Sequence, residues 1–249
     1  MSSDATTKKA QFCNNGQSIQ GAAELSNGDK VFLAPTDRNK DVILDALRPL
    51  LETSQYVVEI GSGSGQHVYH FANQFPKVVF QPTEYDVSLF KSIKAYTADL
   101  PAGHHVREPL ELDTTMDEHW DVILDTGVRE HQTQAPAEGA YDLAIATNIF
   151  HITSWAVGSS LVRGAGRLLK PGGILTCYGS FKKDGKFSTE SNAEFDKTLR
   201  GRDPSWGVKD IEEIQKVAEE SDVGLRLHEI RDMPSNNYLL IFKKISLEQ

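Results

Sequence analysis

The chain has 249 residues, of which 39% are hydrophobic and 24% are charged. This length suits one large α/β domain and is too short for two ordinary domains with a linker. No apolar run reaches the roughly 20 residues of a membrane span, and the opening MSSDATTKKAQFCNNGQS is polar, so we expect a soluble, cytoplasmic protein without a membrane partner.

A net charge of −9 at pH 7 would repel a polyanion, so nucleic acid is not an expected partner. Cys13 and Cys177 have no metal-ligand spacing, and no metal is expected.

The order of elements predicts an N-terminal leader over residues 1–34, partly disordered, and a single domain over residues 35–249. Pro35-Thr36-Asp37 is typical of a helix start, and apolar residues then recur at helical spacing. The remaining apolar patterns predict strands over 56–60, 78–80, 106–112, 141–147, 174–178, 225–231 and 238–243, and helices over 67–75, 87–98, 118–124 and 208–220, with another that ends at Leu169 before Lys170-Pro171-Gly172-Gly173.

This alternation of strands and helices predicts an α/β fold of the Rossmann-like kind. The apolar run over 141–147 is typical of a strand buried on both faces of a parallel sheet. The last two strands are joined by a short turn and should form an antiparallel hairpin. We therefore expect a mostly parallel seven-stranded sheet, an antiparallel last strand and helices on both faces. The polar stretch over 181–210 interrupts the order, and we expect a cover segment near residues 181–207.

Glycines cluster where the first predicted strand ends, in Glu59-Ile60-Gly61-Ser62-Gly63-Ser64-Gly65. Such a turn lets the backbone approach a nucleotide-like ligand without interference from side chains. The dinucleotide fingerprint G-x-G-x-x-G fits less well, because the third glycine comes one residue early and Gln66 occupies its place.

An acidic residue leading into G-x-G-x-G resembles motif I of class I S-adenosylmethionine-dependent methyltransferases. The resemblance implies that the turn holds the methionine portion of the cofactor, with Glu59 near its ammonium end. Glu84 lies about 20 residues beyond the glycines, where a carboxylate can accept both hydrogen bonds of a ribose diol, and Asp86 is its rival. Asp113 ends the third predicted strand, from which class I enzymes usually contact the adenine amino group.

Further blocks resemble a family of class I methyltransferase-like proteins that includes methyltransferase-like protein 26. The blocks include Arg38-Asn39-Lys40, Ser62 to His67, Asn148 to Ile152, Trp206-Gly207 and Asn236-Asn237. Glu84 and Ser180 depart from it, since relatives usually carry aspartate and proline there. The resemblance implies S-adenosylmethionine as cofactor, S-adenosylhomocysteine as product, and cofactor contacts from Arg38, Asn39, Glu59, Gly61, Ser62, Gly63, Gly65, Gln66, His67, Glu84, Asp113 and Asn148.

Candidate catalytic residues follow the fourth predicted strand. His151 can act as a base near neutral pH, supported by Asn148, although an equally good interpretation is a histidine that only shapes its loop. Candidate substrate residues, each of which has core packing or a surface ion pair as its alternative, are Trp155, Tyr178, Phe181, Arg200, Arg202 and Trp206.

These patterns predict methyl transfer from S-adenosylmethionine to an oxygen, sulfur or nitrogen atom of a small-molecule substrate. Three alternatives stay open: a non-catalytic S-adenosylmethionine-binding or interaction protein, a protein methyltransferase, and a nucleotide-dependent oxidoreductase. The loop Asn148-Ile149-Phe150-His151 lacks the two prolines that base-directed amino-methyltransferases generally carry, which also argues against a nucleic-acid substrate.

Overall fold

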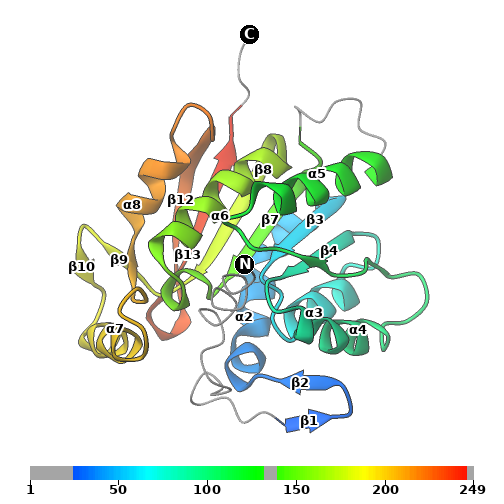
Figure 1. Ribbon diagram of the computed structural model, residues 1–249, viewed down its shortest axis with the longest axis horizontal. Coiled ribbons are helices and arrows are strands. Elements are labelled where there is room, and N and C mark those ends of the chain that lie inside the picture. Colours follow the sequence, from blue (N-terminus) through cyan, green and yellow to red (C-terminus); the bar gives the residue numbers. More distant parts are fainter. Residues whose placement is uncertain (1–24, 132–138, 246–249) are drawn as a thin grey trace, which may run out of the picture.

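A single mixed sheet forms the centre of the molecule in the computed structural model, which describes residues 25–131 and 139–245 (Figure 1). Its strands follow the order β12-β13-β8-β7-β3-β4-β5, and β6 also pairs with β4. Their bounds are β3 Tyr56–Ile60, β4 Val79–Glu84, β5 His105–Val106, β6 Leu110–Glu111, β7 Tyr141–Thr147, β8 Leu169–Gly179, β12 Leu225–Met233 and β13 Asn237–Lys244.

Strand directions confirm the predicted fold class. β3 runs parallel to β4 and β7, and β7 runs parallel to β8. β13 is antiparallel to both β8 and β12, so it is the one reversed strand of this sheet. Because β5 and β6 both pair with β4, they share one position, and the sheet has the predicted seven positions. The reversed strand between β8 and β12 distinguishes this sheet from the ordinary dinucleotide-binding order.

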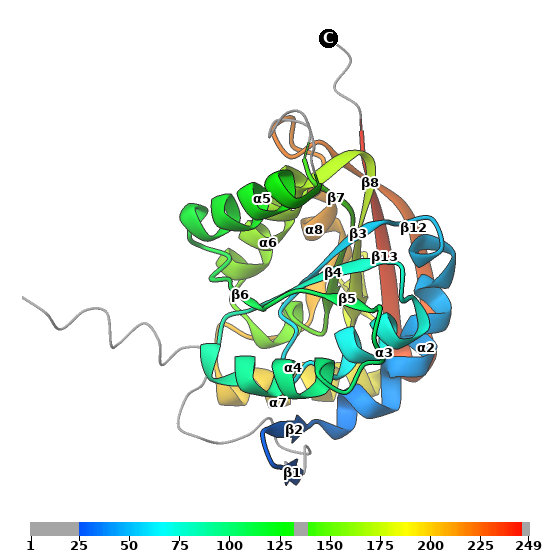
Figure 2. The same cartoon turned by 90° about the vertical axis from the view of Figure 1, so that its right-hand side faces the viewer.

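Helices cover both faces of the sheet, as Figure 2 shows from the side. One face packs against α2 Ala34–Leu51, α3 Gln66–Gln74 and α4 Phe90–Thr97, and the other packs against α5 Asp117–His131, α6 Trp155–Leu168 and α8 Ile211–Ala218. Neighbouring residues of β3 alternate between the two cores, with Val57 in one and Val58 in the other. In the described part of the chain, no helix combines the length and apolarity needed to cross a membrane.

The sheet has a switch point between β3 and β7. β3 connects onward to β4 on one side, while β7 lies on its other side, so the loops after β3 and β7 leave in opposite directions. Ligands of open α/β sheets bind at the carboxyl ends of strands at such a point. The predicted glycine turn follows β3 and the loop of His151 follows β7, so the fold brings these two predicted elements to one place.

Three predicted elements differ in detail. The third strand, expected over 106–112, is divided into β5 and β6. The helix before Lys170 ends at Leu168, close to the predicted end, but the strand expected over 174–178 already begins at Leu169. Lys170 to Gly173 bulges within this strand, because Tyr141 pairs with Leu169 while Leu143 pairs with Ile174. The helix expected from residue 208 begins at Ile211, since Lys209–Asp210 forms the short strand β11.

Two segments lie outside the main sheet. Within the predicted leader, β1 Leu25–Asn27 and β2 Lys30–Phe32 form a hairpin; Cys13 and the earlier leader are outside the described residues. The predicted cover contains β9 Phe181–Lys183, β10 Lys186–Phe187 and α7 Glu190–Arg202, and β11 adds to β9 (Figure 1). Short 3₁₀ turns complete the chain: η3 Val87–Leu89, η5 Phe150–Ile152 and η6 Pro234–Asn236.

Candidate functional site

The glycine turn joins β3 to α3 with three left-handed residues. Gly61, Gly63 and Gly65 have φ values of 68°, 55° and 90°, which side chains rarely tolerate. Packing also excludes a Cβ at Gly65, where it would lie 2.7 Å from Ile93 Cα. At Gly61 a Cβ would lie 2.8 Å from Ile149 Cδ1, the movable end of a side chain. At Gly63 the nearest atom of the described residues, Leu33 Cδ1, would be 4.0 Å from the Cβ. Gly63 therefore leaves open space beside the turn.

Glu84 ends β4 and braces the same turn. Its Oε2 accepts a hydrogen bond of 2.7 Å from the Gly63 N–H, and its Oε1 accepts one of 3.0 Å from the Asp86 N–H. Burial raises the pKa of Glu84, and these backbone donors oppose that rise. Asp86, the predicted rival for a ribose, accepts from the Ser88 N–H and caps η3. The geometry brings Glu84, and not Asp86, to the turn.

Glu59 is a buried carboxyl group at the base of the turn. Its side chain is 2% exposed, and burial raises its pKa to about 8, with the Glu84 charge adding to the rise and the neighbouring Ser62 opposing it. Among the described residues, neither Glu59 Oε2 nor Ser62 Oγ has a hydrogen-bond partner at normal distance and angle. Buried polar atoms are nearly always satisfied, so two adjacent exceptions indicate a place for a polar ligand.

Asp113 follows β6, which pairs with β4 beside Glu84. Its Oδ1 accepts from both the N–H and the hydroxyl of Thr115, and its own N–H donates to His119 Nδ1. These contacts fix the carboxyl group at the carboxyl end of the strand where the sequence predicts it. Its contact with an adenine remains a prediction.

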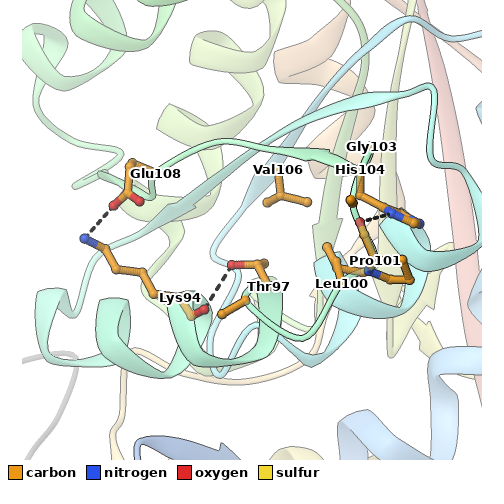
Figure 3. Close-up of a pocket in the computed structure, with 10 residues that line it drawn as sticks. Lys94, Thr97, Leu100, Pro101, Gly103, His104, Val106 and Glu108 are labelled. Atoms are coloured by element: carbon orange, nitrogen blue, oxygen red, sulfur yellow. Dashed lines mark hydrogen bonds and ion pairs between the residues drawn. The ribbon is translucent and has the colours of Figure 1, made fainter.

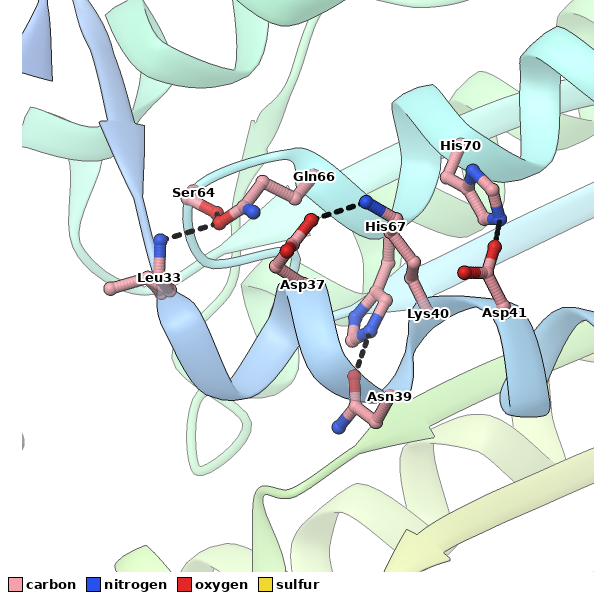
Figure 4. A network of polar contacts seen from close by, with 9 residues as sticks. All are labelled: Leu33, Asp37, Asn39, Lys40, Asp41, Ser64, Gln66, His67 and His70. Atoms are coloured by element: carbon pink, nitrogen blue, oxygen red, sulfur yellow. Dashed lines mark hydrogen bonds and ion pairs between the residues drawn. The ribbon is translucent and has the colours of Figure 1, made fainter. Parts of the chain in front are cut away.

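Polar contacts fasten α2 and the preceding hairpin to α3, as Figure 4 shows. Asn39 Oδ1 lies 2.9 Å from His67 Nε2, and burial lowers the pKa of His67 to about 3, so this neutral ring donates to the amide. Gln66 Oε1 accepts from the Leu33 N–H at 2.6 Å and from the Ser64 hydroxyl at 2.9 Å. Three of the predicted cofactor residues thus hold the walls of the turn.

Other members of this network were not predicted. Ser92 accepts from the Val31 N–H and donates to the Ser64 carbonyl oxygen, which links the hairpin, α4 and the turn. Lys40 pairs with Asp37 in the first turns of α2. Arg38, a predicted cofactor residue on the same helix, is exposed. Serines of this kind have no sequence signature, because their partners come from distant elements.

The loop after β7 carries Asn148 and His151. Asn148 has a φ of 59° and its N–H donates to the Tyr178 carbonyl oxygen at 2.8 Å. A Cβ placed on Gly179 would lie 3.5 Å from His151 Nδ1 and 3.6 Å from Asn148 Oδ1, so both side chains face the same glycine. The two predicted catalytic residues therefore lie together. Ser154 caps α6 directly after this loop.

The predicted cover segment packs over His151. The Phe195 ring of α7 meets the imidazole edge-on at 5.2 Å, and the Gly207 N–H donates to the His151 carbonyl oxygen. The histidine is 8% exposed, and burial together with the charge of Lys209 lowers its pKa to about 4. His151 is therefore neutral at physiological pH.

Two surface depressions lie elsewhere. The first depression has a volume of about 460 Å³ and lies between α4 and the loop before β5, where Lys94, Leu100, His104 and Glu108 line it (Figure 3). The second, of about 240 Å³, lies near Leu50 and Lys170. Neither depression is lined by a predicted site residue. No group of three or more His, Cys, Asp or Glu side chains suited to a metal occurs within residues 25–131 and 139–245.

Residues 30–244 match the family described as "Protein of unknown function (DUF938)". This chain belongs to that family. The match includes the glycine turn, the His151 loop and the cover segment, and therefore the whole candidate site of this DUF938 member.

Solved structures with similar folds include methyltransferases of low sequence identity. An O-methyltransferase family protein from Burkholderia thailandensis has a TM-score of 0.64 at 16% identity, over 85% of this chain and 60% of that one. Human N-acetylserotonin methyltransferase, in complex with S-adenosylmethionine, has a TM-score of 0.60 at 13% identity, over 85% of this chain and 53% of that one. CalO1, a methyltransferase in calicheamicin biosynthesis with S-adenosylhomocysteine bound, has a TM-score of 0.59 at 15% identity, over 84% of this chain and 54% of that one. The DUF938 chain thus has the class I methyltransferase fold and spans 53 to 60% of those structures.

The predicted substrate residues of this DUF938 chain divide by environment. Phe181 is 1% exposed and packs edge-on against Phe150, so it belongs to the core in this conformation, as the alternative interpretation has it. Tyr178 is also buried, and its hydroxyl accepts from Asn237 Nδ2 at 3.0 Å. The partly or fully exposed members of the set are Trp155, Arg200, Arg202 and Trp206.

The Arg200 side chain is held next to the His151 loop. Its Nε donates to Asp196 Oδ2 at 2.8 Å, and Asp196 Oδ1 accepts from the Val208 N–H at 2.7 Å. Arg200 Nη2 would be 2.6 Å from a Cβ on Gly207, whose N–H binds the His151 carbonyl. Phe195, Asp196 and Lys209 were not predicted as site residues, because nothing in their local pattern indicates that α7 and the segment after it return to the β7 loop.

The raised pKa of Glu59 predicts a stability gain for Glu59→Gln in the absence of ligand. The folded wild type binds a proton near pH 8 and the unfolded chain near pH 4.5, so wild-type stability falls as pH rises between these values. At pH 9 the free energy of unfolding of Glu59→Gln should exceed that of the wild type by about 3 kcal/mol, and the difference should disappear at pH 4.5. Denaturant unfolding at both pH values measures it, with exposed Glu118→Gln as the control. An equal or lower stability of Glu59→Gln at pH 9 would contradict the assignment.

Proposed function

We propose that this protein transfers a methyl group from S-adenosylmethionine to a small-molecule acceptor. The observation that carries the proposal is the left-handed glycine turn, open at Gly63, beside the unsatisfied buried atoms of Glu59 and Ser62. This combination suits a ligand that approaches the backbone closely and presents a polar, cationic end. The human and CalO1 structures with a similar fold, described with S-adenosylmethionine and S-adenosylhomocysteine, support the same ligand class.

The residues present fit that cofactor. Glu59, with Ser62 and the turn, would hold its ammonium end, because an ammonium group would satisfy the orphaned Glu59 oxygen. Glu84 has further lone pairs for a ribose diol, and Asp113 is fixed beside it for the adenine. Arg38, Asn39, Gln66 and His67 would flank the site, and Asn148 would close it from the other side. When bound, the cofactor supplies an activated methyl group on a sulfonium centre.

The chain's own groups would prepare the acceptor. His151 is neutral at physiological pH, so a ring nitrogen is free to accept a proton from a hydroxyl or amine. Asn148 would orient the acceptor, since its amide oxygen faces the same glycine as His151 Nδ1. The cover segment would exclude water from this loop. We also propose that the chain is a relative of the family that includes methyltransferase-like protein 26.

Mass spectrometry of a metabolite extract tests the proposed transfer. The extract is incubated with the protein and S-adenosylmethionine that carries a deuterated methyl group, with a Gly63→Leu variant as the matched control. We expect one or a few small molecules to gain the label with the wild type only. Label on proteins alone would favour a protein methyltransferase, and bound cofactor with no labelled product would favour a non-catalytic protein; either result would overturn the proposal.

A further inference from the structure

Lys209 is a buried cation without a close carboxylate. It is 7% exposed, and its Nζ donates to the Ser205 carbonyl oxygen at 3.1 Å. No ion pair within 4.0 Å joins it to any described Asp or Glu side chain. An ammonium group has three donors and is costly to bury unless it is paired. Two donors of Lys209 therefore have no acceptor in the described structure.

The side chains around Lys209 do not neutralise its positive charge. The negative charge of Asp196 acts on Lys209, but the Asp196 carboxylate already accepts hydrogen bonds from Arg200 and from the Val208 N–H. Glu213 also acts on Lys209 from α8, while Arg200 and Lys182 add positive charge. Burial and Arg200 together lower the pKa of Lys209. The cluster thus contains three cations against two carboxylates.

This cation lies beside the proposed catalytic histidine. Gly207, two residues before Lys209, donates its N–H to the His151 carbonyl oxygen, and the Arg200 guanidinium lies against the same glycine. The charge of Lys209 also acts on His151. Phe195 meets the imidazole ring and remains 36% exposed. A molecule that reaches His151 therefore meets unpaired positive charge and an aromatic surface together.

We propose that Lys209, assisted by Arg200, binds an oxyanion of the methyl acceptor, so that the acceptor is a small, partly aromatic or apolar carboxylate or phosphate. This inference rests on the proposed methyl transfer and names its substrate class. Charge-assisted hydrogen bonds from a buried ammonium to an oxyanion are among the strong ones in proteins, because little water competes for them.

The bound anion would also change His151. At present burial, with the charge of Lys209 as a second cause, lowers the pKa of the histidine, so His151 is a weak base. A negative charge next to Lys209 offsets that effect and raises the pKa of His151 toward its ordinary value. The acceptor would thereby strengthen the base that deprotonates it, while water alone would not.

Nuclear magnetic resonance of the His151 ring, in protein saturated with S-adenosylhomocysteine, tests this inference. The probes are benzoate, phenyl phosphate and neutral benzamide, and the His151 signal is assigned with a His151→Gln variant. We expect one of the two anions to bind at least about tenfold more tightly than benzamide and to raise the pKa of His151. The tighter anion identifies a carboxylate or a phosphate as the preferred group.

The decisive variant is Lys209→Met, and Lys197→Met is its control on the exposed face of α7. The Lys209→Met variant should be at least as stable as the wild type, because the substitution removes an unpaired buried charge. Its affinity for the tighter anion should be lower by about tenfold or more. Lys197→Met should bind as the wild type does. Equal binding of benzamide and the anions, or unchanged anion binding in Lys209→Met, would overturn the inference. S-adenosylhomocysteine affinity, measured separately by calorimetry, shows whether the proposed function fails as well.

Discussion

Replacement of Gly63 by leucine is expected to abolish measurable binding of S-adenosylhomocysteine, a loss of at least about 100-fold in affinity. The added side chain would project into the space beside the turn, where the nearest atom of residues 25–131 and 139–245, Leu33 Cδ1, lies 4.0 Å from the Cβ position. It would also force a left-handed φ of 55° on a residue with a side chain. Isothermal titration calorimetry measures the affinity.

The control for this variant is Gly103→Leu. Gly103 also has a left-handed φ, of 94°, and has no atom within 4 Å of its Cβ position, but it lies in the loop before β5. Both variants therefore carry similar backbone strain, and only the one at the turn should lose the ligand. If Gly63→Leu keeps its fold and binds within twofold of the wild type, the turn is not the cofactor site.

For a hydroxyl or amine acceptor, His151→Ala should lower the rate constant of methyl transfer by about 10² to 10⁴, the usual contribution of a general base. Affinity for S-adenosylhomocysteine should change little, because His151 lies on the β7 loop beneath Phe195 and not on the glycine turn. Single-turnover kinetics with the acceptor found by mass spectrometry measures the rate.

The melting temperature of the variant separates catalysis from packing. His151 is buried against Phe195, so its loss will cost some stability, and His104→Ala in the exposed loop before β5 controls for the general effect of removing a histidine. A His151→Ala protein that melts far lower yet transfers methyl groups at the wild-type rate would show that the histidine only shapes its loop. A preformed thiolate acceptor needs no base, and the rate loss would then be small.

Much of the fold could be predicted because the sequence signals are local. The apolar runs of β3 and β7 define both strands to the residue, and the three glycines require the left-handed turn that follows β3. Parallel strands place their carboxyl ends along one edge, so the clustering of Glu59, Glu84 and Asp113 follows from topology.

The parts that could not be predicted depend on distant partners. Lys170 to Gly173 follows the predicted end of the helix, but its place as a bulge within β8 depends on the pairing of β8 with β7. Phe181 looks like a pocket aromatic until Phe150, from another loop, covers it. Lys209 has no motif at all, and its burial depends on the pairing of β11 with β9, which the local sequence does not indicate.

Binding of S-adenosylmethionine and its product is the central claim, and calorimetry of the wild-type protein against S-adenosylhomocysteine, with NAD as the comparison ligand, tests it most directly. We expect one S-adenosylhomocysteine per chain, no heat with NAD, and binding that Gly63→Leu removes. The glycine spacing and the unsatisfied carboxyl group of Glu59 both predict this preference. Binding of NAD together with no binding of S-adenosylhomocysteine at millimolar concentration would contradict the account.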